Sequence, residues 1–249
     1  SHPVISVSFR TGHQHGVGLL VRARNTALGL VILVFASVLP LAEGEVHGSA
    51  PFALPFAEPP GVSTWFVSQW YGNTATAYRN RAVLYRAGQG LHFGVDFAAR
   101  CGTIVRAIGD GIVVAVDGPY GAAPHNVVIA HPNGYRSLYG HLLERSPLQV
   151  GQRVQQGDPV GKVGDPASPN CDRAPHLHLE IRDASMRRAF NPVSLIEADW
   201  RRLTLGLTLP GQRFVLSYES PMQWRTPWDQ PDVTFGGILL NEWQDTWPR

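Results

Sequence analysis

The sequence predicts an all-β protein, mainly antiparallel, that forms a sandwich or barrel with short helical and β appendages. The chain has 26 glycines and 20 prolines, which is more than average and suits a protein rich in turns. From about residue 65 onward, short runs of β-branched residues are separated by Gly, Pro and Asp at the roughly 8–12-residue spacing of sandwiches and barrels. The four clearest runs are 103–108, 111–116, 126–130 and 176–181.

The amino-terminal part of the chain has the pattern of an export signal. Residues 1–24 form a basic tail with three arginines and no acidic residue, and residues 25–42 are mostly apolar. The apolar run is shorter than the roughly 20 residues that a membrane span needs. We therefore expect residues 25–42 to be a signal peptide or a membrane anchor, with a buried core helix as the alternative. Residues 43–64 then form a Pro-rich linker, and the protein is secreted, periplasmic or anchored to the cell envelope.

The overall composition excludes two classes of protein. The formal net charge is +2 at pH 7 and no run of basic residues occurs, so we expect no nucleic-acid partner. Hydrophobic residues make up 44% of the chain, which is enough for a globular core and too few for a multi-pass membrane protein. The sequence does not predict an oligomeric state.

The expected compartment determines how the two cysteines, Cys101 and Cys171, are interpreted. Outside the cytoplasm a pair of cysteines is expected to form a disulfide rather than two free thiols. A catalytic Cys–His pair is the alternative. The bridge would join a point just after segment 92–97 to a point just before segment 176–181, and would hold the two segments together at one end.

Three segments each combine an apolar face with histidine on the opposite face. In a β-strand, residues separated by an even number of positions point to the same side. In segment 92–97, Phe93, Val95 and Phe97 are then expected to face the core. The polar sides carry His92 and Asp96 in segment 92–97, Ser137, Tyr139 and His141 in segment 137–142, and His176, His178 and Glu180 in segment 176–181.

These side chains are the types that bind zinc. Imidazole and carboxylate groups suit Zn²⁺, and three protein ligands with an open fourth position are typical of a catalytic site. The sequence has no His-Glu-x-x-His helix, which excludes the helical zinc-peptidase arrangement. We expect Tyr139 to have a structural role, with a place at the border of the groove as the alternative. We expect Glu180 to lie outside the first ligand shell or at the surface, with a catalytic role as the alternative, and His125 and His131 to be structural.

Several motifs occur in a fixed order. They are His92-Phe-Gly-Val-Asp96, Gly102-Thr-Ile-Val, Gly111-Ile-Val, Leu138-Tyr-Gly-His-Leu142, Val150-Gly-Gln-Arg-Val-Gln-Gln-Gly157, Gly161-Lys-Val-Gly164, His176-Leu-His178 and Asn191-Pro192. In these motifs the chain resembles the lysostaphin/LytM-type zinc peptidases over about residues 90–195. Residues 65–91 and the carboxy-terminal part match no motif of that family.

The resemblance implies a duplicated-hybrid-motif fold for a peptidase domain at residues 65–198, with its core at 90–195. It implies a zinc-dependent metalloendopeptidase that hydrolyses peptide bonds in bacterial peptidoglycan, with peptidoglycan peptides as its partner. It also implies the roles of five residues, all of them intact: zinc ligands His92, Asp96 and His178, with one Zn²⁺ per chain, and catalytic residues His141 and His176.

Two other interpretations remain for this region. Some relatives of these peptidases have lost ligands and act only as activators of other hydrolases, so a non-catalytic peptidoglycan-binding or hydrolase-activating module is the alternative function. Residues 150–164 also resemble lipoyl and biotinyl carrier domains. Lys162 lacks the neighbours that a modified lysine has in those domains, and this argues against the carrier interpretation.

Residues 199–249 form a Trp-rich extension. We expect a helix at 193–200 and a hairpin at 203–218 around Pro210-Gly211. We also expect the tryptophans to pack over the peptidase domain, because large aromatic side chains contribute most when buried and no Gly/Ser-rich linker precedes them. Stacking on the sugar rings of glycan strands is the alternative. The tryptophans concerned are Trp224, Trp228, Trp243 and Trp247.

Overall fold

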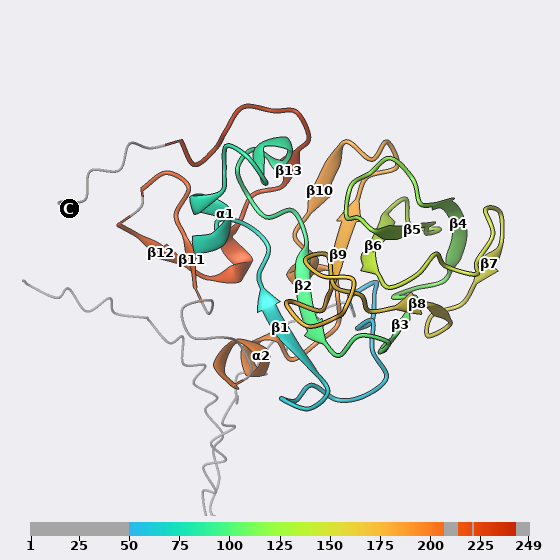
Figure 1. Cartoon of the computed structure of the whole chain (residues 1–249). Helices are drawn as coiled ribbons and strands as arrows, with labels where there is room; N and C mark the ends of the chain where they lie inside the picture. The colour runs from blue at the N-terminus through green and yellow to red at the C-terminus, as the bar shows by residue number, and fades with distance from the viewer. Residues whose placement is uncertain (1–49, 207–213, 221, 243–249) are drawn as a thin grey trace, which may run out of the picture. The chain divides into compact units, whose positions relative to one another are not determined.

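The computed structural model describes residues 50–206, 214–220 and 222–242 (Figure 1). The basic tail, the apolar segment 25–42 and the first part of the linker lie outside these ranges, as do Pro210-Gly211, Trp243 and Trp247. Within the described ranges, no helix has the length and apolar character that crossing a membrane requires.

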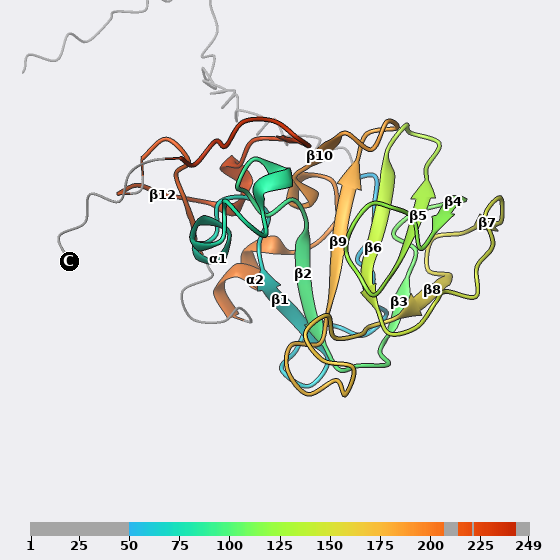
Figure 2. The ribbon, with the colours of Figure 1, turned by 45° about the horizontal axis from the view of Figure 1, so that its top comes forward.

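An antiparallel sheet of nine strands dominates the described part of the chain. The hydrogen-bonded order is β1-β2-β9-β6-β5-β4-β7, and β10 and β13 continue it beside β9. Figures 1 and 2 both show β1, β2, β9 and β6 side by side. The all-β prediction is therefore confirmed. The strands are β1 Trp65–Gln69, β2 Val95–Ala99, β4 Gly111–Val116, β5 His125–Ala130, β6 Arg136–Leu142, β7 Arg153–Val154, β9 His176–Arg182, β10 Arg188–Phe190 and β13 Val233–Thr234.

Three of the four strand runs lie close to where the sequence predicts them. Strand β4 has the predicted bounds, and β5 and β9 differ by one residue at one end. The run at 103–108 is shorter: β3 is Ile104–Arg106, and it pairs with β8, Pro159–Lys162, in a separate two-stranded sheet. Val105 of β3 and Val160 of β8 are fully buried in the same core cluster as the apolar side of the main sheet.

The helices of the described residues are all short. They are α1 Ala75–Arg79, η1 Arg86–Gly88, η2 Pro192–Ser194, α2 Trp200–Gly206 and η3 Pro227–Asp229. The helix predicted at 193–200 is wrong in position, because the turn after Asn191 stops at Ser194 and a new helix begins at Trp200. Trp200 and Leu203 are both buried and lie three residues apart, so helical spacing places them on one face. The hairpin predicted at 203–218 is wrong at its start, because Leu203 belongs to α2, and its turn at Pro210-Gly211 lies outside the described residues.

The described part of the carboxy-terminal extension packs against the core through aliphatic residues and through the aromatic residues Trp200, Tyr218 and Phe235. Val215 and Val233 are fully buried, and β13 pairs with β10. Strand β11, Val215–Leu216, pairs with β12, Trp224–Arg225. The prediction that tryptophans supply the packing is wrong for Trp224 and Trp228, which are 63% and 41% exposed.

Cys101 and Cys171 form a disulfide, as the sequence predicts. Their Cα atoms are 6.0 Å apart, and the bridge closes a loop with a sequence separation of 70 residues. It connects the turn after β2 to the loop before β9. It therefore holds two neighbouring strands of the sheet at one end.

Removal of this disulfide is expected to lower the free energy of unfolding by about 4 kcal/mol, because the reduced unfolded chain gains the entropy of a long open loop. The change is Cys101→Ser together with Cys171→Ser, and the measurement is urea unfolding of the oxidised wild-type protein and the double variant. Unfolding midpoints that coincide, with equal slopes, would contradict this expectation.

Candidate functional site

Three adjacent strands in the middle of the sheet carry Asp96, His141, His176 and His178, and His92 lies just before the first of these strands. Asp96 of β2 lies directly opposite His178 of β9, and Gly140 of β6 lies opposite His178 on the other side. On β9 the predicted alternation holds. Leu177 and Leu179 are fully buried in the core, while His178 and Glu180 lie on the other face.

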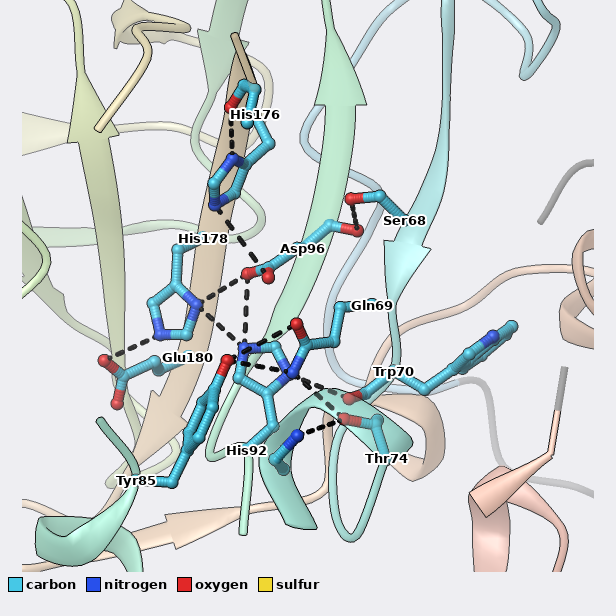
Figure 3. Close-up of polar contacts among 12 residues, drawn as sticks. Ser68, Gln69, Trp70, Thr74, Tyr85, His92, Asp96, His176, His178 and Glu180 are labelled. Atoms are coloured by element: carbon cyan, nitrogen blue, oxygen red, sulfur yellow. Dashed lines mark hydrogen bonds and ion pairs between the residues drawn. The ribbon is translucent and has the colours of Figure 1, made fainter. Parts of the chain in front are cut away.

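Three ligand-type side chains converge on this face: His92, Asp96 and His178 (Figure 3). The Nε2 atom of His92 is 3.3 Å from Oδ1 of Asp96 and 3.2 Å from Nδ1 of His178. Nδ1 of His178 is 2.7 Å from the same Asp96 oxygen. All three side chains are buried.

Each of the two imidazole rings has one nitrogen that faces away from the cluster and one that faces into it. The hydrogen bond of the outward-facing nitrogen determines whether the inward-facing nitrogen carries a lone pair. Nδ1 of His92 is 2.8 Å from the carbonyl oxygen of Trp70, and a carbonyl can only accept a hydrogen bond. Nε2 of His178 faces the Glu180 carboxylate at 3.2 Å. With protons on these outer atoms, two nitrogen lone pairs and one carboxylate oxygen point at a common centre. Such a donor set fits a divalent metal ion, with carbonyl and carboxylate groups orienting the rings from outside.

The charges around the cluster also favour a cation at its centre. Burial by itself would raise the pKa of the Asp96 carboxyl, but His92, His176 and His178 hold it well below its usual value. Burial would lower the pKa of His178, yet hydrogen bonds to Asp96 and Glu180 outweigh it and raise that pKa to about 9. The cluster thus retains negative charge and attracts a positive one, which a proton or a metal ion can supply.

A buried ion pair supports the cluster from outside. Glu180 is fully buried, and Arg182 donates to it from Nε at 2.6 Å and from Nη2 at 3.0 Å. The Arg182 guanidinium lies 4.0 Å from the ring centre of Phe235, which also packs edge-on against Phe93. Phe93 in turn contacts the His178 ring at a centroid distance of 5.7 Å. The carboxy-terminal extension therefore packs against the residues that orient His178.

The Arg182→Leu change is expected to lower the free energy of unfolding by about 3–5 kcal/mol, because it leaves the Glu180 charge buried without a partner. Arg188→Leu is the matched control, since Arg188 pairs with Asp232 on the surface at 2.6 Å and such pairs contribute about 1 kcal/mol or less. Chemical denaturation of the two variants measures the difference. Equal losses in both would show that Glu180 does not depend on Arg182.

The alternation predicted for residues 137–142 is wrong for Ser137 and Tyr139, which do not share the face of His141. Ser137 and Tyr139 point into the core, where the Tyr139 hydroxyl accepts a hydrogen bond from the Ile108 N–H at 2.9 Å. His141 has a φ of +57°, and the pairing of β5 with β6 shifts register at this point. The extra residue reverses the order of faces. His141 therefore reaches the site, while Leu142 faces the core.

His141 and His176 lie next to the cluster and to each other. Their ring centroids are 4.8 Å apart, and the His141 ring is 5.6 Å from that of His178. Each Nδ1 donates to a backbone carbonyl, that of Ala123 for His141 and that of Ala174 for His176. This leaves each Nε2 as a proton acceptor. Burial and the neighbouring histidines lower the pKa of His141 to about 4, so its ring is neutral at pH 7.

The strand predicted at 92–97 begins three residues late, at Val95. His92 precedes it and exchanges backbone hydrogen bonds with Gly72 at 2.7 and 2.9 Å. Phe93 therefore does not point inward with Val95 and Phe97 but lies half-buried beside His178. A Cβ atom at position 94 would lie 2.7 Å from the His178 ring. Only a glycine at this position lets the backbone lie so close to that ring.

Tyr85, a neighbour of His92, and its hydrogen-bond partner Gln69 both come from the segment that matched no motif. The Tyr85 ring packs edge-on against His92 at 5.6 Å, and its hydroxyl accepts a hydrogen bond from Gln69 at 3.0 Å. Burial and the Asp96 charge raise the pKa of Tyr85 to about 12, which keeps the hydroxyl protonated. A signal for Gln69 existed in the sequence, because it continues the inward-facing series of Trp65 and Val67 with a polar residue.

The remaining singled-out histidines lie away from the cluster. His125 pairs with the Asp117 carboxylate at 3.1 Å. His131 contacts the Asp110 carbonyl and the Ser137 hydroxyl, each at 2.8 Å. Burial lowers the pKa of His131. Both side chains thus stabilise local backbone or core structure.

Comparison with known proteins finds similarity centred on this site. The model of a family described as peptidase family M23 matches residues 90–192. The DD-carboxypeptidase/endopeptidase Mpg of Neisseria meningitidis serogroup B is 41% identical over 105 residues, which are 42% of this chain and 23% of that protein. The peptidoglycan DD-endopeptidase ShyA of Vibrio cholerae is 41% identical over 93 residues, or 36% and 20% of the two chains.

Lysostaphin of Staphylococcus simulans is 31% identical over 134 residues, which are 53% of this chain and 26% of that protein. The chain thus spans about a quarter of the length of the curated relatives it matches. Among solved structures, the catalytic domain of lysostaphin from Staphylococcus simulans is 27% identical, covers 52% of this chain and 90% of that domain, and gives a TM-score of 0.40.

Proposed function

We propose that residues 90–192, which match the model of peptidase family M23, form a domain of that family. On this premise the protein is a zinc-dependent metalloendopeptidase that hydrolyses peptide bonds in bacterial peptidoglycan. The observation that carries the proposal is the convergence of two imidazole nitrogens and a carboxylate oxygen in a buried cluster. The names of Mpg and ShyA, which describe DD-endopeptidases, support the same reaction and substrate class.

In this proposal His92, Asp96 and His178 hold one zinc ion through Nε2, Oδ1 and Nδ1. Two nitrogens and one oxygen are a common ligand set for Zn²⁺, and three protein ligands leave a position for water or substrate. The hydrogen bonds to the Trp70 carbonyl and the Glu180 carboxylate would fix the ring orientations and make the rings better ligands.

His141 and His176 are proposed as the catalytic residues. When bound, the zinc would supply Lewis-acid chemistry by polarising the scissile carbonyl and activating water near neutral pH. The Nε2 atoms of His141 and His176 are the proton-accepting positions beside the cluster. One of them would take the proton from the attacking water, and the other would stabilise the developing oxyanion or donate to the leaving amine. The geometry makes both histidines suitable for either role.

The proposed place of action is outside the cytoplasm, whether secreted, periplasmic or anchored to the cell envelope. The basic tail followed by an apolar segment at residues 25–42 supports export. The Cys101–Cys171 disulfide supports an oxidising compartment as well. Residues 25–42 would serve as the signal peptide or the anchor.

A non-catalytic binding or activating module is the less favoured function. Such a module has no need of a complete ligand set with oriented rings and two further histidines beside it. Here all five side chains are in place, and in each of the four histidines the nitrogen that faces away from the cluster has a hydrogen-bond acceptor.

Digestion of purified muropeptides by the full chain tests the proposal. We expect new peptide termini in the mass spectra of the products, loss of this activity after treatment with a chelator, and recovery on addition of Zn²⁺. Products cleaved in the glycan would contradict the peptidase assignment. Cleavage that continues at full rate in excess chelator would contradict the metal.

A further inference from the structure

An open pocket of about 410 Å³ lies beside the cluster, at the end of the β1–β2 pair. Its lining includes Phe66 and Ser68 of β1, Ala98 of β2 and the segment 173–176 that leads into β9. Phe66 and Ala98 are only partly buried, so the pocket presents apolar surface to solvent. These apolar side chains are therefore not fully covered by the packing of the protein core.

The pocket lies on the same face of the sheet as the proposed zinc ligands. Asp96 and Ala98 are two residues apart on β2, and His176 and His178 are two residues apart on β9. Ala98 is paired with His176 in the register of these strands. His176, which lies next to the cluster, therefore also lines the pocket, and a substrate held at the cluster would place a neighbouring residue in the pocket.

Two arginines, Arg100 and Arg173, line this pocket. Both are exposed, and neither guanidinium forms a hydrogen bond or ion pair with any residue that the structure describes. Elsewhere on the surface, Arg145, Arg188 and Arg225 pair with carboxylates. Two unpaired guanidinium groups on an apolar pocket leave positive charge available to a ligand.

The segments that carry the two arginines are held in place by covalent and hydrogen bonds. Arg100 precedes Cys101, and Arg173 lies two residues after Cys171, so the disulfide joins the two segments. The Asp165 carboxylate accepts hydrogen bonds from the backbone N–H groups of Arg173 and Ala174, both at 2.9 Å. The backbone positions of the arginines are thus set before a ligand arrives, which lowers the entropy cost of binding.

We propose that this pocket recognises a substrate residue with a free carboxylate on a short aliphatic stem, next to the scissile bond. The inference rests on the proposed function. The apolar floor would contact the methylene groups, and the planar guanidinium groups would bind the carboxylate, to which their geometry is matched. Glycine offers neither group. The enzyme would therefore act on cross-links built from acidic or diamino-acid residues in preference to glycine bridges.

The test compares two cross-linked peptides that differ only in this carboxylate, which is free in one and a carboxamide in the other. For the full chain loaded with Zn²⁺, we expect kcat/KM to be roughly 10–100-fold higher for the free acid, the range of charge-assisted hydrogen bonds. In the Arg100→Gln/Arg173→Gln double variant this ratio should fall to near one. Arg201→Gln, at another exposed arginine, is the matched control and should keep the ratio.

A second measurement makes the test independent of turnover. Calorimetric titration of the metal-stripped full chain with each peptide should show tighter binding of the free acid by a similar factor, and loss of the difference in the double variant. Circular dichroism confirms that the variants are folded.

The outcomes separate the pocket from the proposed function. Cleavage of both peptides at equal kcat/KM would overturn the pocket assignment and leave the peptidase standing. A preference for the acid that survives in the double variant would overturn the role of the arginines. If neither peptide is cleaved, the proposed function fails, and the titration alone decides the pocket: equal affinity for acid and amide overturns it.

Discussion

Alanine in place of His178 is expected to remove zinc and peptidase activity together. The side chain contributes one of the three converging ligand atoms, and its ring is held between Asp96 and Glu180. With one ligand lost, the remaining pair of His92 and Asp96 cannot form a closed three-ligand site. The same result is expected for His92→Ala and Asp96→Ala, because no other ligand-type residue of the described part of the chain joins the cluster.

The measurement is the zinc content of the purified variants by elemental analysis, together with the rate of muropeptide cleavage. His125→Ala is the matched control, since His125 lies on the same sheet but pairs with Asp117 away from the cluster. It should retain one zinc per chain. Full zinc occupancy in folded His178→Ala protein would show that the ligand assignment is wrong.

His141→Ala and His176→Ala are expected to keep zinc and lose roughly 10²–10⁴-fold in kcat, the usual contribution of an acid–base or oxyanion partner. Neither ring belongs to the converging group of three ligand atoms. Each is fixed by a hydrogen bond from Nδ1 to a backbone carbonyl, so its loss removes a proton acceptor and leaves the metal ligands in place.

Zinc content and kcat measured on the same samples separate the two classes of residue. A metal-free His176→Ala protein beside a metal-bound His178→Ala protein would reverse the assignment of the pair on β9. Wild-type kcat in either the His141 or the His176 variant would exclude that residue from catalysis.

Much of this arrangement follows from local sequence patterns. The period of two in His176-Leu-His-Leu-Glu-Ile181 is strong because each apolar residue must be buried, and this places His178 and Glu180 together on the other face. The same period extends to Arg182, which could have been found in this way. The disulfide was predictable from the expected compartment, and the ordered motifs indicated the five proposed site residues by resemblance.

Other features depend on contacts between distant segments. The left-handed backbone at His141 reverses the strand alternation, and it depends on hydrogen bonds from its N–H to Ala122 and from Gly164 to its carbonyl. The pairing of His92 with Gly72 and the packing of Phe235 on Arg182 connect the site to segments that no family motif covers. Such contacts leave no periodic signal.

By itself, the sequence determined which faces are apolar and which residue types lie opposite them, because burial of alternate side chains is a local requirement of a strand. Only the tertiary structure decided that β2, β9 and β6 are neighbours, that a bulge turns His141 toward His176, and that the disulfide brings the segments of Arg100 and Arg173 to one pocket. The physical reason is that strand order, register shifts and pocket walls are set by the free energy of packing the whole chain. The hydrophobic pattern of a single segment carries no information about that free energy.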